Sequence, residues 1–405
     1  MTASSTSKEA SMKAVTWQGK RKVSVEEVPD PKIEEPTDII IKVTSSCICG
    51  SDLHLYEVMA PFMEKGDIMG HEPIGIVSEI GSAITNVSVG DRVVIPFNIS
   101  CGHCYMCKQG LQSQCETTQV REHDRGAALF GYSKLYGQIP GGQAEYLRVP
   151  QAQYGPIVIP KDGPDDRYIY LSDVLPTAWQ AVEYASIPEG GTVVVMGLGP
   201  IGDMATRIAK YRGAGKVIGV DLVDERLDRA SQNGIETIDL RQHEKDLKDV
   251  ILSLTDNRGP DSVIDAVGLE AHGSPLIKFV QSAAGAMPDP LAEAVIEKAG
   301  VDRLAALHAA IDTVRRGGTV SLSGVYAGKA DPMPLDVMFD KQIQLRMGQA
   351  NVKRWIDDIL PLLNDDDPLG VASFATHHLA LEDAPRAYEI FQKKQDGAVK
   401  IILKP

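Results

Sequence analysis

The stretch VVVMGLGPIGDMA, residues 193–205, decides the fold expected for the second half of this 405-residue chain. It begins with an apolar run typical of a buried strand and continues into a pattern typical of a helix. Between them, Gly197 would allow a tight turn, Gly199 would let the backbone approach a pyrophosphate, and Gly202 would let helix and strand pack closely. The helix N-terminus would face the anion. Such glycines also occur in ordinary turns, but the context on both sides favours a dinucleotide-binding loop.

The regions around this loop repeat the strand–helix pattern. Short apolar runs predict strands at residues 192–197, 216–221, 261–268, 319–325 and 342–348, with amphipathic helices between them. This alternation is typical of a doubly wound parallel sheet. We expect a nucleotide-binding domain over residues 175–348, with an insertion at about residues 271–302 that the pattern does not place.

The second predicted strand of this domain ends in Asp221. A carboxylate there can accept hydrogen bonds from both ribose hydroxyls and would repel a 2′-phosphate, which favours NAD over NADP. Arg226 follows shortly and could tolerate a phosphate, although it also fits a solvated helix face. The cofactor expectation is therefore NAD, with NADP less favoured.

Residues 1–174 predict a different, mostly-β domain. Their apolar runs are short, rich in Val and Ile, and bounded by Gly, Pro, Asp or Asn. The tail, residues 349–405, has a helical pattern and ends in the strand-like run AVKIILKP. We expect this last strand to return to the first domain.

Composition excludes several classes of protein. The chain has 41 basic and 55 acidic residues, and a net charge of −14 disfavours a nucleic-acid partner. No apolar run is long enough to span a membrane. The N-terminus has no apolar core of signal-peptide length, which predicts a cytoplasmic location. In a reducing compartment, the six cysteines are expected to be metal ligands before disulfides.

Four of these cysteines lie in the segment CGHCYMCKQGLQSQC, and we call them the cysteine clip: Cys101, Cys104, Cys107 and Cys115. Thiolates this close in sequence can surround one tetrahedral ion, which predicts structural zinc. A redox dithiol or an iron–sulfur cluster are the alternatives. A closed four-thiolate site has no open position for a substrate, so any reaction at a metal would need a second centre.

A second, open zinc site needs three protein ligands. The candidates outside the clip are scattered over three segments: Cys47, Cys49, Asp52 and His54, then His71 and Glu72, then Asp173. Spacing alone is only suggestive. Cys47 and Cys49 would point to the same side of a strand, so strand alternation does not choose between them.

The combination of GHE at residues 70–72, the cysteine clip and the glycine loop, in this order, resembles the zinc-dependent medium-chain dehydrogenase/reductase family, the alcohol dehydrogenases. The resemblance covers nearly the whole chain after Met12. Within the family, CGSDLH (49–54), GGQAEYLRVP (141–150) and LSDVLPT (171–177) are most similar to glutathione-independent formaldehyde dehydrogenases and dismutases. It implies an α/β protein with a GroES-like catalytic domain and a Rossmann nucleotide-binding domain.

The resemblance also implies roles for single residues. The catalytic zinc would be held by Cys49, His71 and Asp173, with Glu72 behind it, and the clip would hold a second, structural zinc. Cys47 would be a small buried hydrophobe. Ser51, the cofactor ribose and then His54 would relay a proton to solvent, and Asp52 would orient a ligand. The residues implied at the cofactor are Thr177, Gly197, Gly199, Pro200, Ile201, Gly202, Asp221, Arg226 and Val267.

The activity implied is reversible hydride transfer between a small-molecule alcohol or aldehyde hydrate and NAD. The resemblance also implies a homodimer or homotetramer, formed through sheet edges near residues 319–348. Rival interpretations are a dismutase that retains NAD(H), a polyol dehydrogenase, and a non-catalytic zinc-stabilised binding protein. Two departures weaken formaldehyde as the substrate. Trp179 and Gln180 replace residues that the formaldehyde branch has near the pocket, and the 271–302 insertion differs from that branch.

Overall fold

The computed structural model describes residues 10–268, 304–326 and 333–405, so the predicted insertion at 271–302 lies outside the described residues. The chain forms two compact units, Met1–Pro176 with Asn351–Pro405, and Thr177–Ala350. We call them the metal-binding unit and the nucleotide-binding unit. Among the described residues, no helix is both long and apolar enough to cross a membrane.

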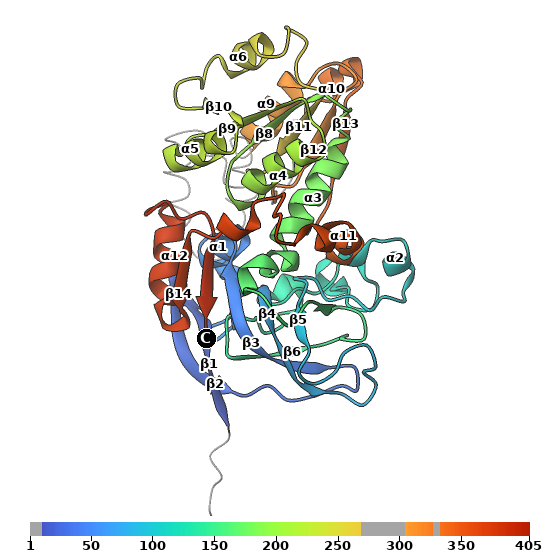
Figure 1. The fold of residues 1–405 in the computed structure, drawn as a ribbon, viewed down its shortest axis with the longest axis vertical. Coiled ribbons are helices and arrows are strands. Elements are labelled where there is room, and N and C mark those ends of the chain that lie inside the picture. The colour runs from blue at the N-terminus through green and yellow to red at the C-terminus, as the bar shows by residue number, and fades with distance from the viewer. Residues whose placement is uncertain (1–9, 269–303, 327–332) are drawn as a thin grey trace, which may run out of the picture. The chain divides into compact units, whose positions relative to one another are not determined.

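The nucleotide-binding unit is built on a six-stranded parallel sheet in the order β10-β9-β8-β11-β12-β13 (Figure 1). The strands are β8 (Thr192–Met196), β9 (Lys216–Asp221), β10 (Glu236–Asp239), β11 (Ser262–Asp265), β12 (Thr319–Leu322) and β13 (Gln344–Met347). The helices are α4 (Pro200–Tyr211), α5 (Asp224–Gln232), α6 (Leu247–Ser253), α9 (Ala305–Thr313) and α10 (Leu335–Lys341). Helix α3 (Val174–Ala185) crosses the boundary between the units.

The central strands are apolar because both of their faces are covered. Val194, Ile218, Val263 and Val320 come from neighbouring strands and are fully buried in one cluster. Continuous Val/Ile runs are typical of parallel strands that lie between helices. The edge strand β10 has the sequence ETID, which is half polar and partly exposed, so hydrophobic pattern alone did not predict it.

The glycine loop adopts the geometry that its sequence predicts. Gly197 has φ +85°, a left-handed conformation that L side chains rarely adopt. A Cβ added to Gly202 would lie 1.7 Å from the carbonyl oxygen of Gly197, so α4 starts in direct contact with the end of β8. At Gly199, the nearest atom to an added Cβ is 3.5 Å away, on Arg226.

The metal-binding unit contains a seven-stranded sheet in which β14-β15-β3-β4-β5-β7 are neighbours and β6 also pairs with β3. A separate hairpin pairs β1 with β2. The strands are β1 (Ser11–Gly19), β2 (Lys22–Pro29), β3 (Ile39–Ile48), β4 (Glu72–Ile80), β5 (Arg92–Val94), β6 (Tyr146–Val149), β7 (Ile157–Val158), β14 (His377–Ala380) and β15 (Ile401–Lys404). The helices are α1 (Gly50–Tyr56), α2 (Tyr105–Lys108), α11 (Val352–Ile359) and α12 (Ala384–Gln392).

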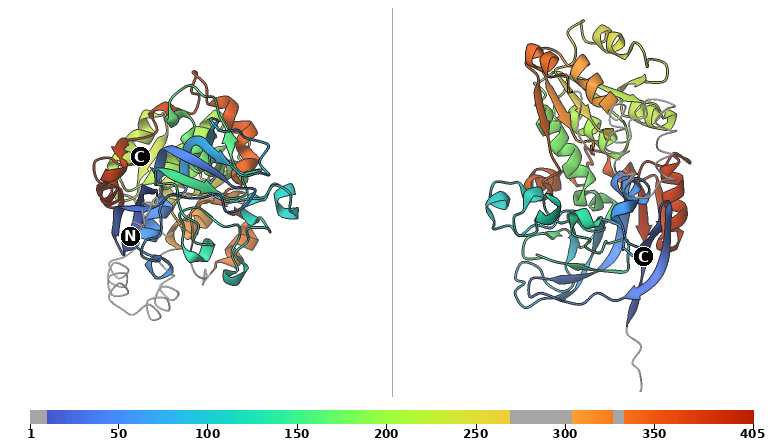
Figure 2. Two further views of the ribbon diagram at one scale, coloured as in Figure 1. Left: turned by 90° about the horizontal axis from the view of Figure 1, so that it is seen from below. Right: turned by 180° about the vertical axis from the view of Figure 1, so that it is seen from behind.

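The last strand joins the sheet beside one of the first. In β15, Ile402 pairs with Cys47 of β3 in an antiparallel register. Figure 2 (right) shows this red C-terminal segment beside the blue N-terminal strands. Strand β14, with the sequence HHLA and only partial burial, extends the sheet edge and has too weak an apolar pattern to be predicted.

A fully buried ion pair connects the residue before β15 with strand β4. Lys400, directly before β15, contacts Glu72, the first residue of β4, and both side chains are fully buried. Burial alone would lower the pKa of Lys400, but Glu72 raises it above its ordinary value and keeps the ammonium charged. Removing one member would leave an uncompensated buried charge, which costs about 3–5 kcal/mol.

The glycine contacts make a testable prediction. We expect Gly202→Ala to lower the free energy of unfolding by about 1–3 kcal/mol or more, because the new methyl group overlaps the Gly197 carbonyl. Gly199→Ala is the matched control and should unfold as the wild type does, since its methyl group has space. Urea unfolding without cofactor measures both, and equal stability of the two variants would contradict this packing.

Candidate metal centres and cofactor loop

Three side chains of the predicted catalytic zinc site come together at the ends of sheet elements. Cys49 caps the N-terminus of α1 just after β3, and His71 directly precedes β4. The pairing of Cys47 with Glu72 in the β3–β4 ladder brings these two together. Asp173 follows a short 3-10 turn, and all three predicted ligands are at most 8% exposed.

The distances between the donor atoms fit a tetrahedral zinc ion. The Asp173 Oδ2 atom lies 3.4 Å from Cys49 Sγ and 3.4 Å from His71 Nε2. With zinc bonds of about 2.0–2.3 Å, tetrahedral edges between such donors are about 3.3–3.6 Å. Glu72 offers a fourth donor atom, an oxygen, since one donor atom of each of the four residues lies within 4.8 Å of the others.

The electrostatics of the site favour a bound cation. Burial, and then the nearby carboxylates of Asp173 and Glu72, raise the pKa of the Cys49 thiol to about 11. Burial would lower the pKa of His71, but Asp52 and Asp173 raise it well above its ordinary value. A buried thiol beside carboxylates becomes a thiolate only when positive charge compensates it, which is what a zinc ion provides.

Two neighbours of the ligands come from helix α1. Asp52 Oδ1 lies 3.1 Å from His71 Nδ1, and Asp52 Oδ2 accepts a hydrogen bond from Cys49 N at 2.9 Å. Ser51 Oγ lies 3.1 Å from His71 Nε2, and His54 is half-buried one turn further along the helix. Asp52 thus stands where an orienting residue would, and the Ser51–His54 relay stays a prediction.

The cysteine clip forms the second convergent group among the described residues. All six cysteines of the chain are free, and in the clip Cys104 Sγ lies 4.0 Å from Cys115 Sγ. A tetrahedral zinc–thiolate site has sulfur–sulfur edges of about 3.8 Å. Backbone N–H groups donate to the sulfurs of Cys101, Cys104 and Cys115 at 3.4 Å.

These N–H groups also favour the ionised form of a clip thiol. Burial would raise the pKa of Cys115, but backbone hydrogen bonds, including that of Cys101 N, lower it to about 6. A thiol that ionises near neutral pH is a prepared metal ligand. The clip therefore fits one closed metal ion.

Most of the predicted cofactor residues lie at or just after the carboxyl ends of β8, β9 and β11. Asp221 Oδ2 accepts a hydrogen bond from Leu198 N at 2.6 Å, and its Oδ1 accepts bonds from the N–H groups of the next two residues. Arg226 Nη1 lies 3.7 Å from the same carboxylate. Asp221 therefore holds the glycine loop against β9.

The remaining loop residues follow the same arrangement. Pro200 and Ile201 begin helix α4. Val267 lies against the loop, since its Cγ2 would be 2.7 Å from a Cβ at Gly197. Thr177 lies in α3 and is half-buried.

Trp179 and Gln180 are interior residues of the nucleotide-binding unit. Trp179 is 4% exposed, and the Arg212 guanidinium lies 5.1 Å from its ring centre. Gln180 Nε2 donates to the carbonyl oxygens of Gly348 and Gln349 at 3.2 and 3.0 Å. The side chains of both residues have contacts inside the unit, and the effect of this departure on substrate choice stays a prediction.

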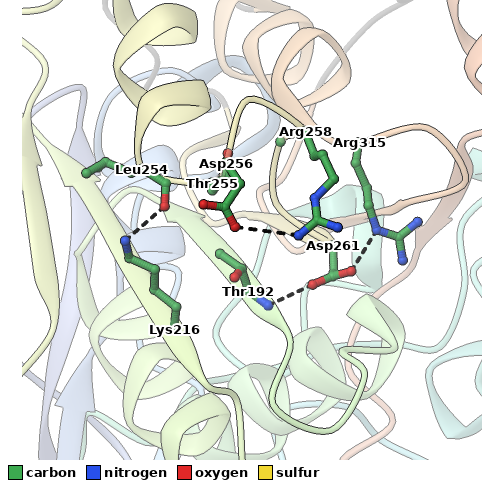
Figure 3. A pocket seen from close by; sticks show the side chains of 9 residues that line it. Thr192, Lys216, Leu254, Thr255, Asp256, Arg258, Asp261 and Arg315 are labelled. Carbon is green, nitrogen blue, oxygen red and sulfur yellow. Dashed lines mark hydrogen bonds and ion pairs between the residues drawn. The ribbon is translucent and has the colours of Figure 1, made fainter.

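A separate surface hollow of about 320 Å³ lies in the nucleotide-binding unit (Figure 3). Thr192, Lys216 and Asp261 line it at the amino ends of their strands, whereas the glycine loop lies at the carboxyl ends. Asp261 accepts hydrogen bonds from Thr192 N at 2.8 Å and from Arg315 Nε at 2.6 Å. These bonds join surface loops, so the hollow is distinct from the predicted cofactor crevice.

The sequence did not point to Lys400, Gln143 or Tyr388, which pack around the ligands. Lys400 interrupts the apolar run AVKIILKP, and a charged residue inside a strand pattern is a signal for a buried partner. Gln143 lies in the quoted GGQAEY segment, where its polar side chain had no assigned role. Tyr388 lies in α12 with no local signal at all.

Comparisons with known proteins identify both domains. Residues 35–161 match the alcohol dehydrogenase GroES-like domain, and residues 200–287 match the zinc-binding dehydrogenase family. These matches confirm the predicted fold class.

An uncharacterized zinc-type alcohol dehydrogenase-like protein of Bacillus subtilis is 41% identical, over 97% of this chain and all of its own. Formaldehyde dismutase of Pseudomonas putida is 34% identical, over 98% of each chain. Among solved structures, an alcohol dehydrogenase from Thermus sp. ATN1 superimposes with a TM-score of 0.80 at 33% identity, over 97% of this chain and all of that one. With full-length relatives at this identity, the chain belongs to the zinc-dependent alcohol dehydrogenase family.

Proposed function

We propose that this protein is an NAD-dependent, zinc-containing dehydrogenase that interconverts alcohols and aldehydes by hydride transfer. The observation that carries the proposal is the convergence of Cys49, His71 and Asp173 at tetrahedral distances in a buried, negatively charged site. Bound there, zinc would supply Lewis acidity, which lowers the pKa of an alcohol hydroxyl and polarises an aldehyde carbonyl. The clip would hold a second zinc, giving two per chain.

The chain itself would move the proton. Ser51 Oγ, 3.1 Å from the ligand nitrogen of His71, is the group of α1 placed to accept the hydroxyl proton of an alcohol. His54 lies on the same helix face and is partly exposed, so its imidazole can release that proton to solvent. Both side chains accept and donate hydrogen bonds, as a relay requires.

NAD is the proposed cofactor because Asp221 is an acid at the ribose end of the loop. Three backbone N–H groups occupy part of its carboxylate, which has about four acceptor positions, so one remains for a ribose hydroxyl. The negative charge disfavours a 2′-phosphate. Arg226, at 3.7 Å, offsets this charge only in part.

A dismutase is the second candidate. It is favoured by the full-length relationship to a formaldehyde dismutase at 34% identity. Such an enzyme would oxidise one aldehyde hydrate and reduce a second aldehyde on the same bound NAD(H). Turnover of aldehyde without added NAD would support it, whereas strict dependence on added NAD would support the dehydrogenase.

We also propose a homodimer formed through the free edge of the parallel sheet. Strand β13 ends the sheet order, and Met347 on it is 60% exposed. Leu335 and Phe339 of the preceding helix α10 are 65% and 87% exposed. An exposed edge strand beside large apolar side chains is the kind of surface that a second copy covers.

Removing the carboxylate ligand tests the metal assignment. We expect Asp173→Ala to reduce the zinc content from two ions per chain to one and to lower kcat/KM by more than about 100-fold. Asp173→Cys is the matched control and should retain both ions, because a thiolate is also a zinc ligand. Elemental analysis with steady-state kinetics measures both effects, and full zinc and activity in Asp173→Ala would refute the assignment.

The charge of Asp221 tests the cofactor preference. We expect Asp221→Asn to lower the preference for NAD over NADP, as a ratio of kcat/KM values, by about 10- to 100-fold, because repulsion of the 2′-phosphate is lost. Asp224→Asn, a nearby exposed acid of α5 paired with Arg241, should leave the ratio unchanged. An unchanged ratio in Asp221→Asn would argue against NAD selection by this residue.

The dimer surface has its own test. We expect Phe339→Asp to shift the protein towards the monomer in sedimentation velocity, since it places a charge in the apolar contact. Val89→Asp changes a 59% exposed apolar residue of the metal-binding unit and should leave the assembly intact. A dimer of equal strength in both variants would place the contact elsewhere.

A further inference from the structure

A buried chain of polar contacts runs from the C-terminal helix α12 to the imidazole of His71. Tyr388 Oη donates to Gln143 Oε1 at 2.9 Å, and Gln143 Nε2 donates to Asp52 Oδ2 at 3.3 Å. The last link is an ion-pair contact, in which Asp52 Oδ1 lies 3.1 Å from His71 Nδ1. Tyr388, Gln143 and Asp52 are fully buried, and His71 is 3% exposed. Four segments of the chain therefore meet in one buried line.

The chemistry of its neighbours fixes the orientation of the Gln143 amide. Its Nε2 faces two acceptors, Asp52 Oδ2 and the carbonyl oxygen of Cys47 at 3.1 Å. Its Oε1 faces the phenol of Tyr388, which can donate. A flipped amide would oppose acceptor to acceptor at Asp52 and Cys47, so these two groups fix the amide and Tyr388 completes its hydrogen bonding at Oε1.

The consequence reaches the metal ligand through Asp52. With Oδ2 occupied by Gln143 and by Cys49 N, the other oxygen, Oδ1, is directed to His71 Nδ1. A carboxylate at Nδ1 keeps the proton on that nitrogen. Nε2, which faces Asp173 and Cys49, is then unprotonated and can bind a metal ion.

Close packing supports the same alignment. Gly70, the residue before His71, has φ +96°, and a Cβ there would lie 2.3 Å from Gln143 Cγ and 2.8 Å from Gln143 N. Gln143 N also donates to Met69 O at 3.0 Å. Gln143 thus touches the backbone that carries His71 as well as the carboxylate that holds its ring.

We propose that Gln143 and Tyr388 are positioning residues that fix the tautomer and direction of the His71 imidazole through Asp52, and so set how firmly the catalytic zinc is held. The proposal rests on the proposed function, because it takes His71 as a zinc ligand. Outer partners of a metal-bound histidine contribute about 10- to 100-fold to metal affinity. The simpler alternative is that the chain only ties α12 to the sheet.

Zinc release from the purified, zinc-loaded full chain tests the proposal. With pyridylazoresorcinol as chelator, Tyr388→Phe should release one zinc per chain about tenfold faster than wild type. The second zinc, held by the cysteine clip, should leave at the wild-type rate and serves as an internal reference. Tyr56→Phe is the matched control: its ring lies 5.3 Å from that of Tyr388, and its hydroxyl makes no hydrogen bond among the described residues.

A second variant separates positioning from stability. Phe391→Leu removes buried packing from the same helix α12 and leaves the hydrogen bonds of Tyr388 and Gln143 in place. If Tyr388 and Gln143 position His71, Phe391→Leu lowers the urea midpoint but releases the catalytic zinc at the wild-type rate, whereas Tyr388→Phe releases it about tenfold faster. If the chain is only a structural tie, both variants release this zinc faster in step with their loss of stability, which overturns the proposal.

The remaining outcomes are also decisive. Equal acceleration of both zinc ions in Tyr388→Phe, or release within twofold of wild type, overturns the positioning role. A wild-type chain that holds only one zinc overturns the proposed catalytic site itself. Two ions in the wild type with no effect of the variants would leave the proposed function standing and remove this inference alone.

Discussion

The metal-binding unit depends on the pairing of a buried acid with a buried base from the other end of the sequence. Glu72 starts the strand that directly follows His71, and Lys400 leads into the strand beside Cys47. Neither charge has access to water, so each is tolerated only in the presence of the other. Because the pair fixes β4 relative to β15, it also fixes where His71 and Cys49 leave the sheet. The position of the predicted ligands therefore follows from a charge requirement as well as from packing.

Buried negative ligands are stabilised in different ways in the two metal-ligand groups. In the clip, thiolates are stabilised by N–H groups of their own loop, so the group is nearly self-contained within residues 101–116. At the predicted catalytic site, Cys49, His71 and Asp173 come from three segments, with the buried cation of Lys400 paired to the adjacent Glu72 and the carboxylate of Asp52 beside His71. Four protein ligands suit a closed structural ion, whereas three protein ligands leave a fourth position available for chemistry.

Sequence reasoning predicted the elements whose signals are local. The Val/Ile runs of β8, β9, β11 and β12 and the turn at Gly197 follow from periodicity and backbone sterics alone. The short polar edge strands β10 and β14 were not predicted, because their residues are partly exposed and carry no apolar pattern. The family resemblance supplied His71 and Asp173 as ligands, but the contacts of Gln143 with Tyr388 and of Glu72 with Lys400 span hundreds of positions. Without an observed pairing, a single sequence has no signal for such contacts.

The return of the chain to its first sheet constrains the order of assembly during synthesis. Residues 177–350 form a separate unit that is complete before residues 351–405 emerge, and domains generally fold as units while the chain is made. The first 176 residues, however, must wait for β15 and Lys400 before Glu72 has its counter-charge. During that interval Cys49 and His71 lack the support of β15 and Lys400. Metal loading of the predicted catalytic site is therefore expected to be a late event of biosynthesis, whereas all four thiols of the clip are present once residue 116 has emerged.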